Sequence, residues 1–483
     1  MLLDGDTCYR ALVARDARFD GMFFVGVATT GIYCRPVCRA RTPGRARCSF
    51  YRTAAEAEGA SFRACFRCRP ELSPGQGPAA AGSRLCAAAV ARIDAGFLNE
   101  ASVDALGAEL GVTGRHLRRT MIAEIGVSPV DLAQSRRLSL AKQLLQDTAL
   151  PLVEVAFASG FSSVRRCNAV FQARFGRPPS ALRREQGAGA GRDALSIRLD
   201  FRPPLDWEAL LGFLARRAIP GVETVADGVY RRTVRLGGVD GWIAVHRDDH
   251  RDALRASISL SLAKALMPLG ARLRALFDLD AHPTAIAAHL GQDPDLAPLV
   301  EQRPGLRMPG AFDAFETAVR TILGQQVSVR AATTICGRLV ARLGAPAETP
   351  FPGLDRRFPS PEVVAQATES TLAELGMPGA RARSLLAVAK AFAEGLRLER
   401  SSDPTAALEH LAALPGIGDW TVQYLSMRAL GWPDAFPASD LVLRKALGGV
   451  SARAAVTRAE AWRPFRAYAV MHLWTGHAAG EPR

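Results

Sequence analysis

The sequence predicts a multidomain α+β protein in which parts of different character follow one another. Its 483 residues exceed the roughly 100–200 residues that one domain usually occupies. Two runs of small residues, glycine and proline, at 73–78 and 187–191, are typical of linkers. Alternating, strand-like segments follow the second run, at 196–201, 230–236 and 242–245, and helical periodicity dominates from Pro309 onward.

The chain carries an uneven excess of positive charge. Lys and Arg number 61 against 47 Asp and Glu, a net charge of +14. Residues 1–192 hold 27 basic and 16 acidic side chains, a net of +11, and the remainder holds 34 and 31, a net of +3. A basic excess favours a polyanionic partner such as nucleic acid, or an acidic membrane surface. The first two-fifths of the chain therefore provide most of the electrostatic case for a phosphate-bearing partner.

The sequence favours a cytoplasmic protein that does not enter a membrane. No stretch reaches the roughly 18–20 consecutive apolar residues of a membrane span. The first residues lack the basic start and apolar core of a signal peptide. In the cytosol, the nine cysteines are expected to be metal ligands or reactive thiols rather than disulfides.

Four of the cysteines form two close pairs. Three residues separate Cys34 from Cys38, and two separate Cys65 from Cys68. Paired thiols joined by a loop supply the four tetrahedral ligands that zinc takes in proteins, so we predict one zinc ion per chain. The competing interpretation is that the four are buried core residues. A structural role is favoured for the unpaired thiols, which are Cys8, Cys48, Cys86, Cys167 and Cys336.

A thiolate held on zinc stays deprotonated and can act as a nucleophile at neutral pH. Arg35, Arg39 and Arg41 flank the first cysteine pair. Basic groups at this position would hold a phosphate next to the nucleophile. The alternative is a closed zinc site with a purely structural role.

An internal repeat lies between about residues 100 and 185. At an offset of 50, Met121 matches Phe171, and Gly126 and Pro129 match their counterparts at 176 and 179. Each unit predicts a helix, a turn at a glycine (Gly111 or Gly160) and a second helix, which is the helix-turn-helix plan. The alternative is an ordinary helical bundle with solvated arginines. The predicted exposed arginines of the second helices are Arg115, Arg118 and Arg119, and Arg165, Arg166 and Arg174.

These motifs make the first 185 residues similar to the Ada adaptive-response proteins. Segments 29–41, 49–51 and 62–68 resemble their N-terminal zinc domain, and the repeat resembles their AraC-type DNA-binding domain. The resemblance implies that the paired cysteines bind zinc and that Cys34 irreversibly accepts a methyl group from a methylphosphotriester in DNA. Loss of negative charge on methylation should then strengthen promoter binding. The resemblance also implies DNA contacts by Thr30, Arg39, Arg41 and Arg63.

The chain departs from the Ada pattern in one respect. Ada proteins usually continue into a domain whose Pro-Cys-His-Arg motif removes methyl groups from guanine O6. That motif does not occur in this sequence, and its last cysteine is Cys336. Direct demethylation of guanine is therefore not expected.

The C-terminal part contains a glycine hairpin followed by an acidic residue. The run Leu-Pro-Gly-Ile-Gly at 414–418 predicts a turn whose N–H groups, at Gly416 and Gly418, bind a DNA phosphate. A plain helix C-cap is the alternative. Asp440 follows at the start of an amphipathic helix, where the helix dipole favours an ionised carboxylate. Its alternative role is a simple N-cap.

The combination of hairpin and aspartate resembles the base-excision DNA glycosylases. The detailed match is to AlkA-type 3-methyladenine glycosylases, and it runs from about Leu195 to the end. It includes segments 211–214, 303–307, 322–329, 375–378 and 420–424. The resemblance implies base flipping, with Asp440 stabilising positive charge on the sugar and helping to activate water. It places Gln326 as the residue that fills the vacated base stack. It implies a base pocket of Phe213, Trp420, Tyr424 and Trp474, although core packing is the alternative for each.

Two further expectations concern the chemistry. Glycosylases that also cut the strand carry a lysine where this chain has Trp420, so a monofunctional enzyme that leaves an abasic site is expected. The iron–sulfur cluster of some relatives needs four C-terminal cysteines, which the sequence lacks, so we expect no iron–sulfur cluster. A glutamine at 326, where AlkA-like enzymes can carry an apolar residue, leaves the strength of the wedge open.

The resulting prediction is a bifunctional alkylation-response protein of four parts. These are an Ada-like zinc-binding methyl-acceptor domain at 1–78, an all-α tandem helix-turn-helix of AraC type at 84–186, an AlkA-like N-terminal α/β domain at 194–305 and an all-α helix-hairpin-helix glycosylase domain at 306–483. The expected partners are double-stranded DNA, both alkylated and promoter DNA, and RNA polymerase, with no membrane and a monomeric chain. The alternative function is a zinc-dependent transcription regulator whose glycosylase domain only binds DNA.

Overall fold

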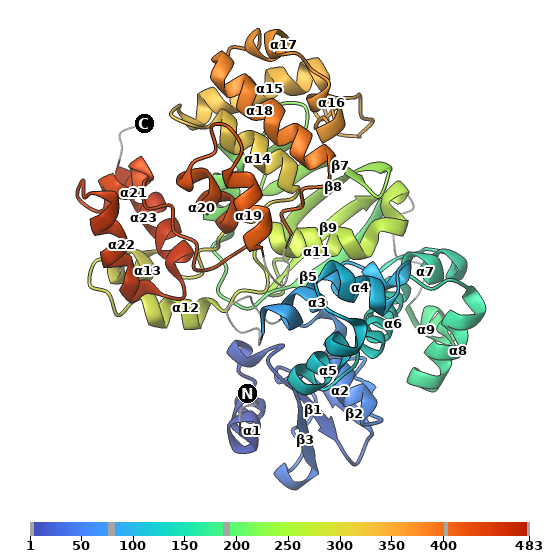
Figure 1. Cartoon of the computed structure of the whole chain (residues 1–483). Helices are drawn as coiled ribbons and strands as arrows, with labels where there is room; N and C mark the ends of the chain where they lie inside the picture. The colour runs from blue at the N-terminus through green and yellow to red at the C-terminus, as the bar shows by residue number, and fades with distance from the viewer. Residues whose placement is uncertain (1–3, 76–82, 187–193, 400–403, 481–483) are drawn as a thin grey trace. The chain divides into compact units, whose positions relative to one another are not determined.

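The computed structural model describes residues 4–75, 83–186, 194–399 and 404–480 (Figure 1). The predicted linker at 187–191 and the second half of the one at 73–78 lie outside these residues. Within the described ranges, none of the helices combines the length and the apolar character needed to cross a membrane. The chain forms two compact units: Met1–Pro203 with Leu236–Val239 and Asp248–Ala271, and Pro204–Arg235 with Asp240–Arg247 and Arg272–Arg483.

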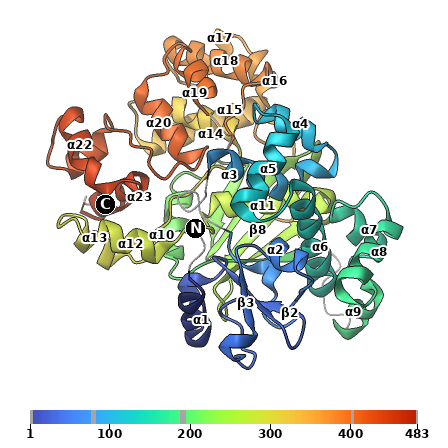
Figure 2. The same cartoon turned by 60° about the horizontal axis from the view of Figure 1, so that its bottom comes forward.

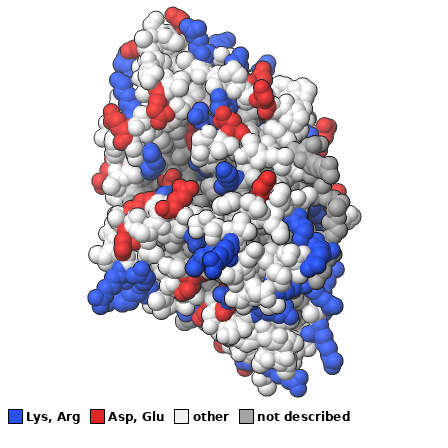
Figure 3. Space-filling model, turned by 90° about the vertical axis from the view of Figure 1, so that its right-hand side faces the viewer, with Lys and Arg blue, Asp and Glu red and all other residues white. Residues whose placement is uncertain are grey.

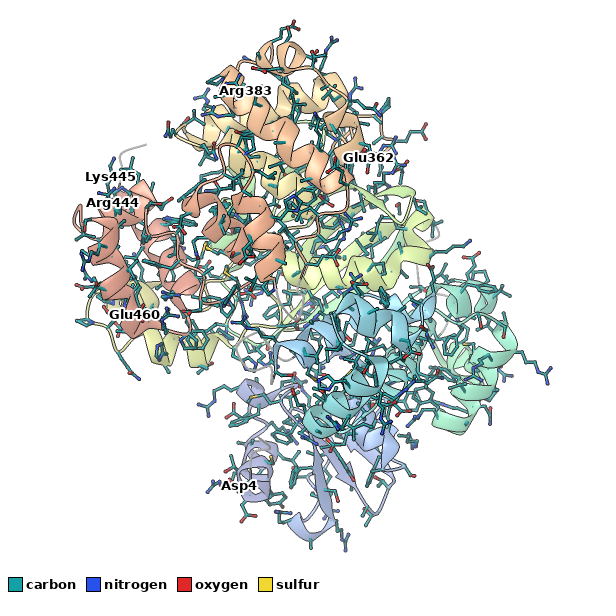
Figure 4. The ribbon with its side chains drawn as sticks, in the orientation of Figure 1. Asp4, Glu362, Arg383, Arg444, Lys445 and Glu460 are labelled. Carbon is teal, nitrogen blue, oxygen red and sulfur yellow. The ribbon has the colours of Figure 1, made fainter. Side chains whose placement is uncertain are left out.

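The first unit begins with a small four-stranded sheet in the order β3-β1-β2-β4. Strand β1 (Phe24–Val27) runs antiparallel to β2 (Ile32–Cys34) and β3 (Cys48–Tyr51), whereas β2 pairs in parallel with β4 (Arg63–Ala64). The parallel pair sets Tyr33 opposite Ala64, so the residues that follow the two strands leave the sheet side by side. Helices α1 (Gly5–Ala14) and α2 (Ala54–Gly59) complete this part, and Asp4, labelled in Figure 4, caps α1.

The predicted tandem helix-turn-helix is confirmed. Glycine takes the left-handed conformation at both predicted turns, with φ of 72° at Gly111 and 83° at Gly160. Thr113 and Ser163 cap the second helix of each helix-turn-helix repeat through their side-chain oxygens. Figures 1 and 2 both show α7, α8 and α9 as one group, apart from α4 and α5. The helices are α3 (Arg84–Asp94), α4 (Val103–Glu109), α5 (Gly114–Ile125), α6 (Pro129–Asp147), α7 (Leu152–Ala158), α8 (Val164–Phe175) and α9 (Pro179–Gln186).

A pair of strands beyond the predicted second linker also belongs to the first unit. The strand expected at 196–201 is observed as β5 (Ala194–Asp200), and it pairs antiparallel along its whole length with β9 (Ala253–Ser259). The side chain of Gln143 in α6 donates a hydrogen bond from Nε2 to the carbonyl oxygen of Arg198 in β5, at 3.1 Å. Strand β5 therefore packs directly against the helices of this unit.

The second unit is mostly helical. Its strands β6 (Glu223–Ala226), β7 (Val229–Leu236) and β8 (Val239–Arg247) are neighbours in the order β8-β7-β6, and they include the strands expected at 230–236 and 242–245. In both Figure 1 and Figure 2, α20 lies between the group α14–α18 and helices α22 and α23. Helix α11 (Leu266–Leu276) crosses the division of the chain between the two units. The other helices are α10 (Trp207–Ala215), α12 (Pro283–Leu290), α13 (Ala297–Gln302), α14 (Ala314–Leu323), α15 (Val329–Leu343), α16 (Pro361–Ala365), α17 (Glu369–Ala373), α18 (Gly379–Ala393), α19 (Thr405–Ala412), α20 (Asp419–Arg428), α21 (Leu441–Ala446), α22 (Ala452–Ala459) and α23 (Arg466–Gly480).

Candidate metal centre and candidate active site

Four cysteine sulfurs converge in the first unit. The Sγ atoms of Cys34, Cys38, Cys65 and Cys68 all lie within 4.8 Å of one another. Cys34 ends β2 and Cys65 directly follows β4, so the parallel pairing of these strands brings the two cysteine pairs together. The structure thus assembles the four residues that the spacing singled out.

This cluster fits a zinc ion. Four sulfurs at about 2.3 Å from a tetrahedral zinc ion stand about 3.8 Å apart, which the observed separations accommodate. Four thiolates at this spacing repel one another strongly. Deprotonation of all four requires a cation that offsets their mutual repulsion. Geometry and charge both support zinc at these four sulfurs.

A buried lysine of the helix-turn-helix part reaches the metal centre. Lys142 in α6 is fully buried, and its Nζ donates to the carbonyl oxygen of Cys65 at 3.3 Å and pairs with Glu71 at 2.8 Å. Sequence reasoning missed this residue. A signal exists, because Lys142 shares one face of α6 with the buried Leu138 and Leu145.

The residues that the Ada resemblance predicts to contact DNA belong to the segments that carry the cysteine pairs. Thr30, Arg39 and Arg41 are exposed. Arg63 is half-buried, with its guanidinium 5.8 Å from the ring centre of Phe66. On the face in Figure 3, Lys and Arg outnumber Asp and Glu in the lower part, whereas both signs alternate in the upper part.

The remaining cysteines are buried and protonated at neutral pH. Burial raises the pKa of Cys8 and Cys167 to about 11 and that of Cys86 and Cys336 to about 12, and it also raises the pKa of Cys48. Protonated, inaccessible thiols are poor nucleophiles and poor ligands. These observations support the structural role expected for the five.

One of the arginines expected to be exposed is turned inward. Arg174, near the end of α8, is half-buried, and its Nη1 lies 3.8 Å from Oε2 of the buried Glu58 in α2. The expectation that Arg174 faces solvent is wrong, because the sheet-containing part of the unit covers this turn of α8. The other five, Arg115, Arg118, Arg119, Arg165 and Arg166, are exposed as expected.

The second unit holds Asp440 at the N-terminus of α21. The Oδ1 atom of Asp440 accepts hydrogen bonds from the backbone N–H of Leu443 at 2.8 Å and from Nε1 of Trp474 at 3.0 Å. Its Oδ2 atom accepts from Nε1 of Trp420 at 2.9 Å. The aspartate is therefore both the helix cap and the acceptor of two indole donors. Later in α21, Lys445 is exposed, whereas Arg444 is half-buried and donates from Nε to the carbonyl oxygen of Val450 at 2.8 Å; both are labelled in Figure 4.

The aromatic rings predicted around Asp440 do come together. Trp420 and Tyr424 stack with ring centres 5.2 Å apart and planes 25° apart, and Trp474 lies 6.1 Å from Tyr424. Such electron-rich faces can stack on an electron-poor base. Phe213, from α10, joins this group through the guanidinium of Arg428, which lies 4.7 Å from its ring centre.

Two arginines beside these rings, the buried Arg428 and the half-buried Arg217, were not anticipated from the sequence. Arg428 donates from Nη1 to the hydroxyl oxygen of Tyr424 at 2.8 Å, and Arg217 lies 3.8 Å from the ring centre of Phe213. Burial raises the pKa of the Tyr424 hydroxyl, and the charges of Arg428 and Arg217 outweigh that effect, so its pKa is lowered. Burial lowers the pKa of Arg217 to about 10.

The predicted hairpin and wedge lie next to each other. Gly416 has φ of 75° between α19 and α20, and Gly418 caps α20; both glycines are exposed. Gln326 is exposed, and its backbone φ is 55°, a conformation that residues other than glycine rarely adopt. Gln325, which sequence reasoning did not single out, joins the two by donating from Nε2 to the carbonyl oxygen of Gly416 at 3.0 Å and to Thr421 Oγ1 at 3.1 Å.

Comparison with known proteins covers most of the chain. Four family models match: "Metal binding domain of Ada" at residues 7–71, "Helix-turn-helix domain" at 106–185, "AlkA N-terminal domain" at 196–313 and "HhH-GPD superfamily base excision DNA repair protein" at 319–465. A protein of Mycobacterium tuberculosis, described as a probable bifunctional transcriptional activator/DNA repair enzyme AlkA, is 44% identical over 482 residues, which cover 98% of this chain and 96% of the relative.

Two further similarities concern the C-terminal half. DNA-3-methyladenine glycosylase 2 of Escherichia coli is 38% identical over 277 residues, 57% of this chain and 95% of that protein. A solved 3-methyladenine DNA glycosylase from Archaeoglobus fulgidus aligns with a TM-score of 0.51 and 23% identity, over 59% of this chain and 99% of that structure. The structural likeness shows a shared fold.

Proposed function

The chain belongs to the family of bifunctional transcriptional activator/DNA repair enzymes that the mycobacterial protein represents, and on that premise we propose which residues carry its two activities. The observation that carries the proposal is the presence, in one chain, of a four-thiol cluster and of an aspartate held by two indoles. We assign methyl transfer to the first and base excision to the second. We also propose domain boundaries at 1–78, 84–186, 194–305 and 306–483.

Base excision breaks the bond between the sugar C1′ and the base nitrogen. An alkylated purine leaves with the bonding electrons, and the ionised Asp440 stabilises the positive charge that develops on the sugar. Water, deprotonated with the help of Asp440, then adds to C1′ and leaves an abasic site. Trp420, Tyr424 and Trp474, with Phe213 beside them, hold the flipped base by stacking. Gln326 fills the gap in the stack, and the N–H groups at Gly416 and Gly418 bind the phosphate backbone.

The catalytic role of Asp440 is tested by base release from methylated duplex DNA. Asp440→Asn keeps the shape but removes the charge, and we expect single-turnover release to fall by about 10²–10³-fold. Glu362→Gln, which changes an exposed carboxylate on α16 (labelled in Figure 4), is the matched control and should act as the wild type does. Equal release by Asp440→Asn and wild type would refute the catalytic role of Asp440, and no release by the wild type would favour a domain that only binds DNA.

Methyl transfer is a displacement at carbon. The Cys34 sulfur attacks the methyl group of a methylphosphotriester, the S–CH₃ bond forms, and the O–CH₃ bond breaks with its electrons left on the phosphate oxygen. Zinc, when bound by Cys34, Cys38, Cys65 and Cys68, keeps the sulfurs deprotonated. Each chain accepts one methyl group, because a thioether does not release it. Thr30, Arg39, Arg41 and Arg63 hold the DNA backbone during the transfer.

Peptide mass mapping after incubation with methylphosphotriester DNA tests the acceptor. We expect one added methyl group, on the peptide that contains Cys34 and on no other cysteine peptide. The buried Cys48 and Cys86 serve as internal controls within the same digest. A methyl group on Cys38, Cys65 or Cys68 instead would reassign the acceptor, and no adduct at all would leave a structural metal site.

Regulation follows from charge. Methylation of one thiolate removes one negative charge from the cluster, which lowers the repulsion of DNA phosphates and strengthens promoter binding by α5 and α8. We propose that the methylated, monomeric chain then recruits RNA polymerase. Promoter affinity should rise after methylation and should be lost when Arg115, Arg118, Arg165 and Arg166 are replaced by alanine. Unchanged affinity on methylation would refute the switch.

A further inference from the structure

Two aspartates from distant segments hold the side chain of Arg35. Its Nε donates to Asp20 Oδ1 at 2.9 Å and its Nη2 to the other oxygen of the same carboxylate, while Nη1 donates to Asp200 Oδ2 at 2.7 Å. Asp20 precedes β1, and Asp200 ends β5. All three side chains are buried and belong to the first unit. A buried charge is tolerated only where it is paired, so this triad fixes the guanidinium in one position.

The same arginine contacts the metal centre at two points. Its backbone N–H donates to the Cys68 sulfur at 3.4 Å, and Nη1 donates to the Cys68 carbonyl oxygen at 3.3 Å. Nη1 carries two hydrogens, so it can serve Asp200 and the Cys68 carbonyl at once. Arg35 also directly follows Cys34 in the chain. Holding Arg35 at both its backbone and its guanidinium therefore limits the positions that the Cys34 sulfur can take.

Asp200 lies in the segment that matches the AlkA N-terminal domain, beyond the range that matches the Ada metal-binding domain. On the same strand, Arg198 donates from Nε to Asp200 Oδ1 at 2.7 Å. Two residues beyond Asp200, the fully buried Arg202 donates from Nε to the carbonyl oxygen of Asp20 at 2.8 Å. Alternate residues of an extended chain share a face. One face of the first strand of the repair half is thus docked on the surroundings of the thiol cluster.

We propose that Asp200 is a positioning residue for methyl transfer at Cys34. The repair half of the chain supplies the anion that holds Arg35, and Arg35 in turn holds the Cys68 loop and the backbone next to Cys34. The inference rests on the proposed methyl transfer for its kinetic consequence. Outer partners of metal ligands set ligand orientation and reactivity, and small displacements of a nucleophile slow its attack. The full reactivity of the sensor therefore depends on Asp200 at the end of β5.

The test replaces Asp200 in the full-length chain. Asp200→Asn should shift the thiolate-to-metal absorption bands of the cobalt-substituted protein. It should also speed the loss of metal to a chelator by about tenfold and slow the methylation of Cys34 by about tenfold. Base release, which depends on Asp440, should stay within about twofold of wild type and reports that the second unit is folded. Asp248→Asn is the matched control, since Asp248 is also buried in this unit and pairs with Arg255 at 2.8 Å.

The outcomes separate the proposals. Unchanged cobalt bands, metal loss and methylation in Asp200→Asn would overturn the role of Asp200, and so would equal changes in Asp248→Asn. If Asp200→Asn does not fold, Asp200→Glu keeps the charge on a longer side chain and should give smaller shifts of the same bands. Cobalt spectra and metal loss do not depend on methyl transfer. A wild-type chain that never methylates Cys34 would refute the proposed sensor, and the spectra would still decide whether Asp200 holds the cluster.

Discussion

The four-cysteine centre and the Asp440 pocket are built in opposite ways. The ligands of the centre fall within residues 34–68, and two short strands in parallel register bring them together. The residues of the pocket are spread from 213 to 474 and meet only because α10, α20, α21 and α23 pack in one unit. The first site gathers like charges that need a cation, whereas the second holds one carboxylate with neutral N–H donors. The two sites should therefore fail under different treatments.

Removal of zinc should produce the largest difference between the two sites. A structural zinc ion contributes about 10–16 kcal/mol in small zinc domains, so treatment with a strong chelator should unfold the small sheet that carries the four cysteines. We expect methyl acceptance to be lost completely, because the thiolates lose their cation. Base release at Asp440 should continue at the untreated rate. Parallel assays of both activities on one chelated sample check this.

A chelated sample that loses both activities would show that the pocket depends on the metal centre. Zinc added back should restore methyl acceptance only while the cysteines remain reduced. The Asp440→Asn variant is the converse control, since it should lose base release and keep methyl acceptance.

The contrast in construction also decides what could be predicted from the sequence. Cysteine pairs at fixed spacing predict a metal centre because ligand geometry limits the spacing. A strand such as 196–201 is evident from alternation, and the paired turn glycines are evident from the repeat. These features depend on neighbouring residues alone.

Contacts between residues far apart in the sequence could not be predicted from spacing and periodicity. Arg174 was expected in solvent because helical periodicity does not show that Glu58 of another segment lies beside it. The pairing of Asp440 with the indoles of Trp420 and Trp474 depends on helix packing, as does the approach of Lys142 to Cys65. The resemblance to known families predicted that the pocket exists, and the structure adds which atoms make it.

Acid should lower the free energy of unfolding of the second unit through a buried histidine. Burial lowers the pKa of His472 to about 4 from 6.5, so below pH 6.5 the unfolded chain binds a proton that the folded chain does not. Stability from this group is complete above pH 6.5, declines as the pH falls and is lost below about 4, a loss of about 3 kcal/mol in total. His472→Gln should flatten the pH dependence of unfolding of the second unit over this window.

The matched control is His410→Gln, which changes an exposed histidine of the same unit. Its pH profile should overlay that of the wild type in denaturant melts between pH 4 and 7. An unchanged profile in His472→Gln would mean that other groups set the acid sensitivity of the second unit.

The smallest expected effect comes from removing the indole N–H donors of the pocket while keeping its aromatic rings. Trp420→Phe and Trp474→Phe each remove one N–H bond to Asp440 and keep an aromatic ring for stacking. A hydrogen bond to a charged group contributes about 1.5–3 kcal/mol, so each variant should slow base release by at least about tenfold. If the indoles act by orienting the carboxylate, the loss appears in the single-turnover rate and leaves DNA affinity unchanged. A loss confined to affinity would instead mean that the indoles serve only to stack the base, and methyl acceptance at Cys34 should be unaffected in both variants.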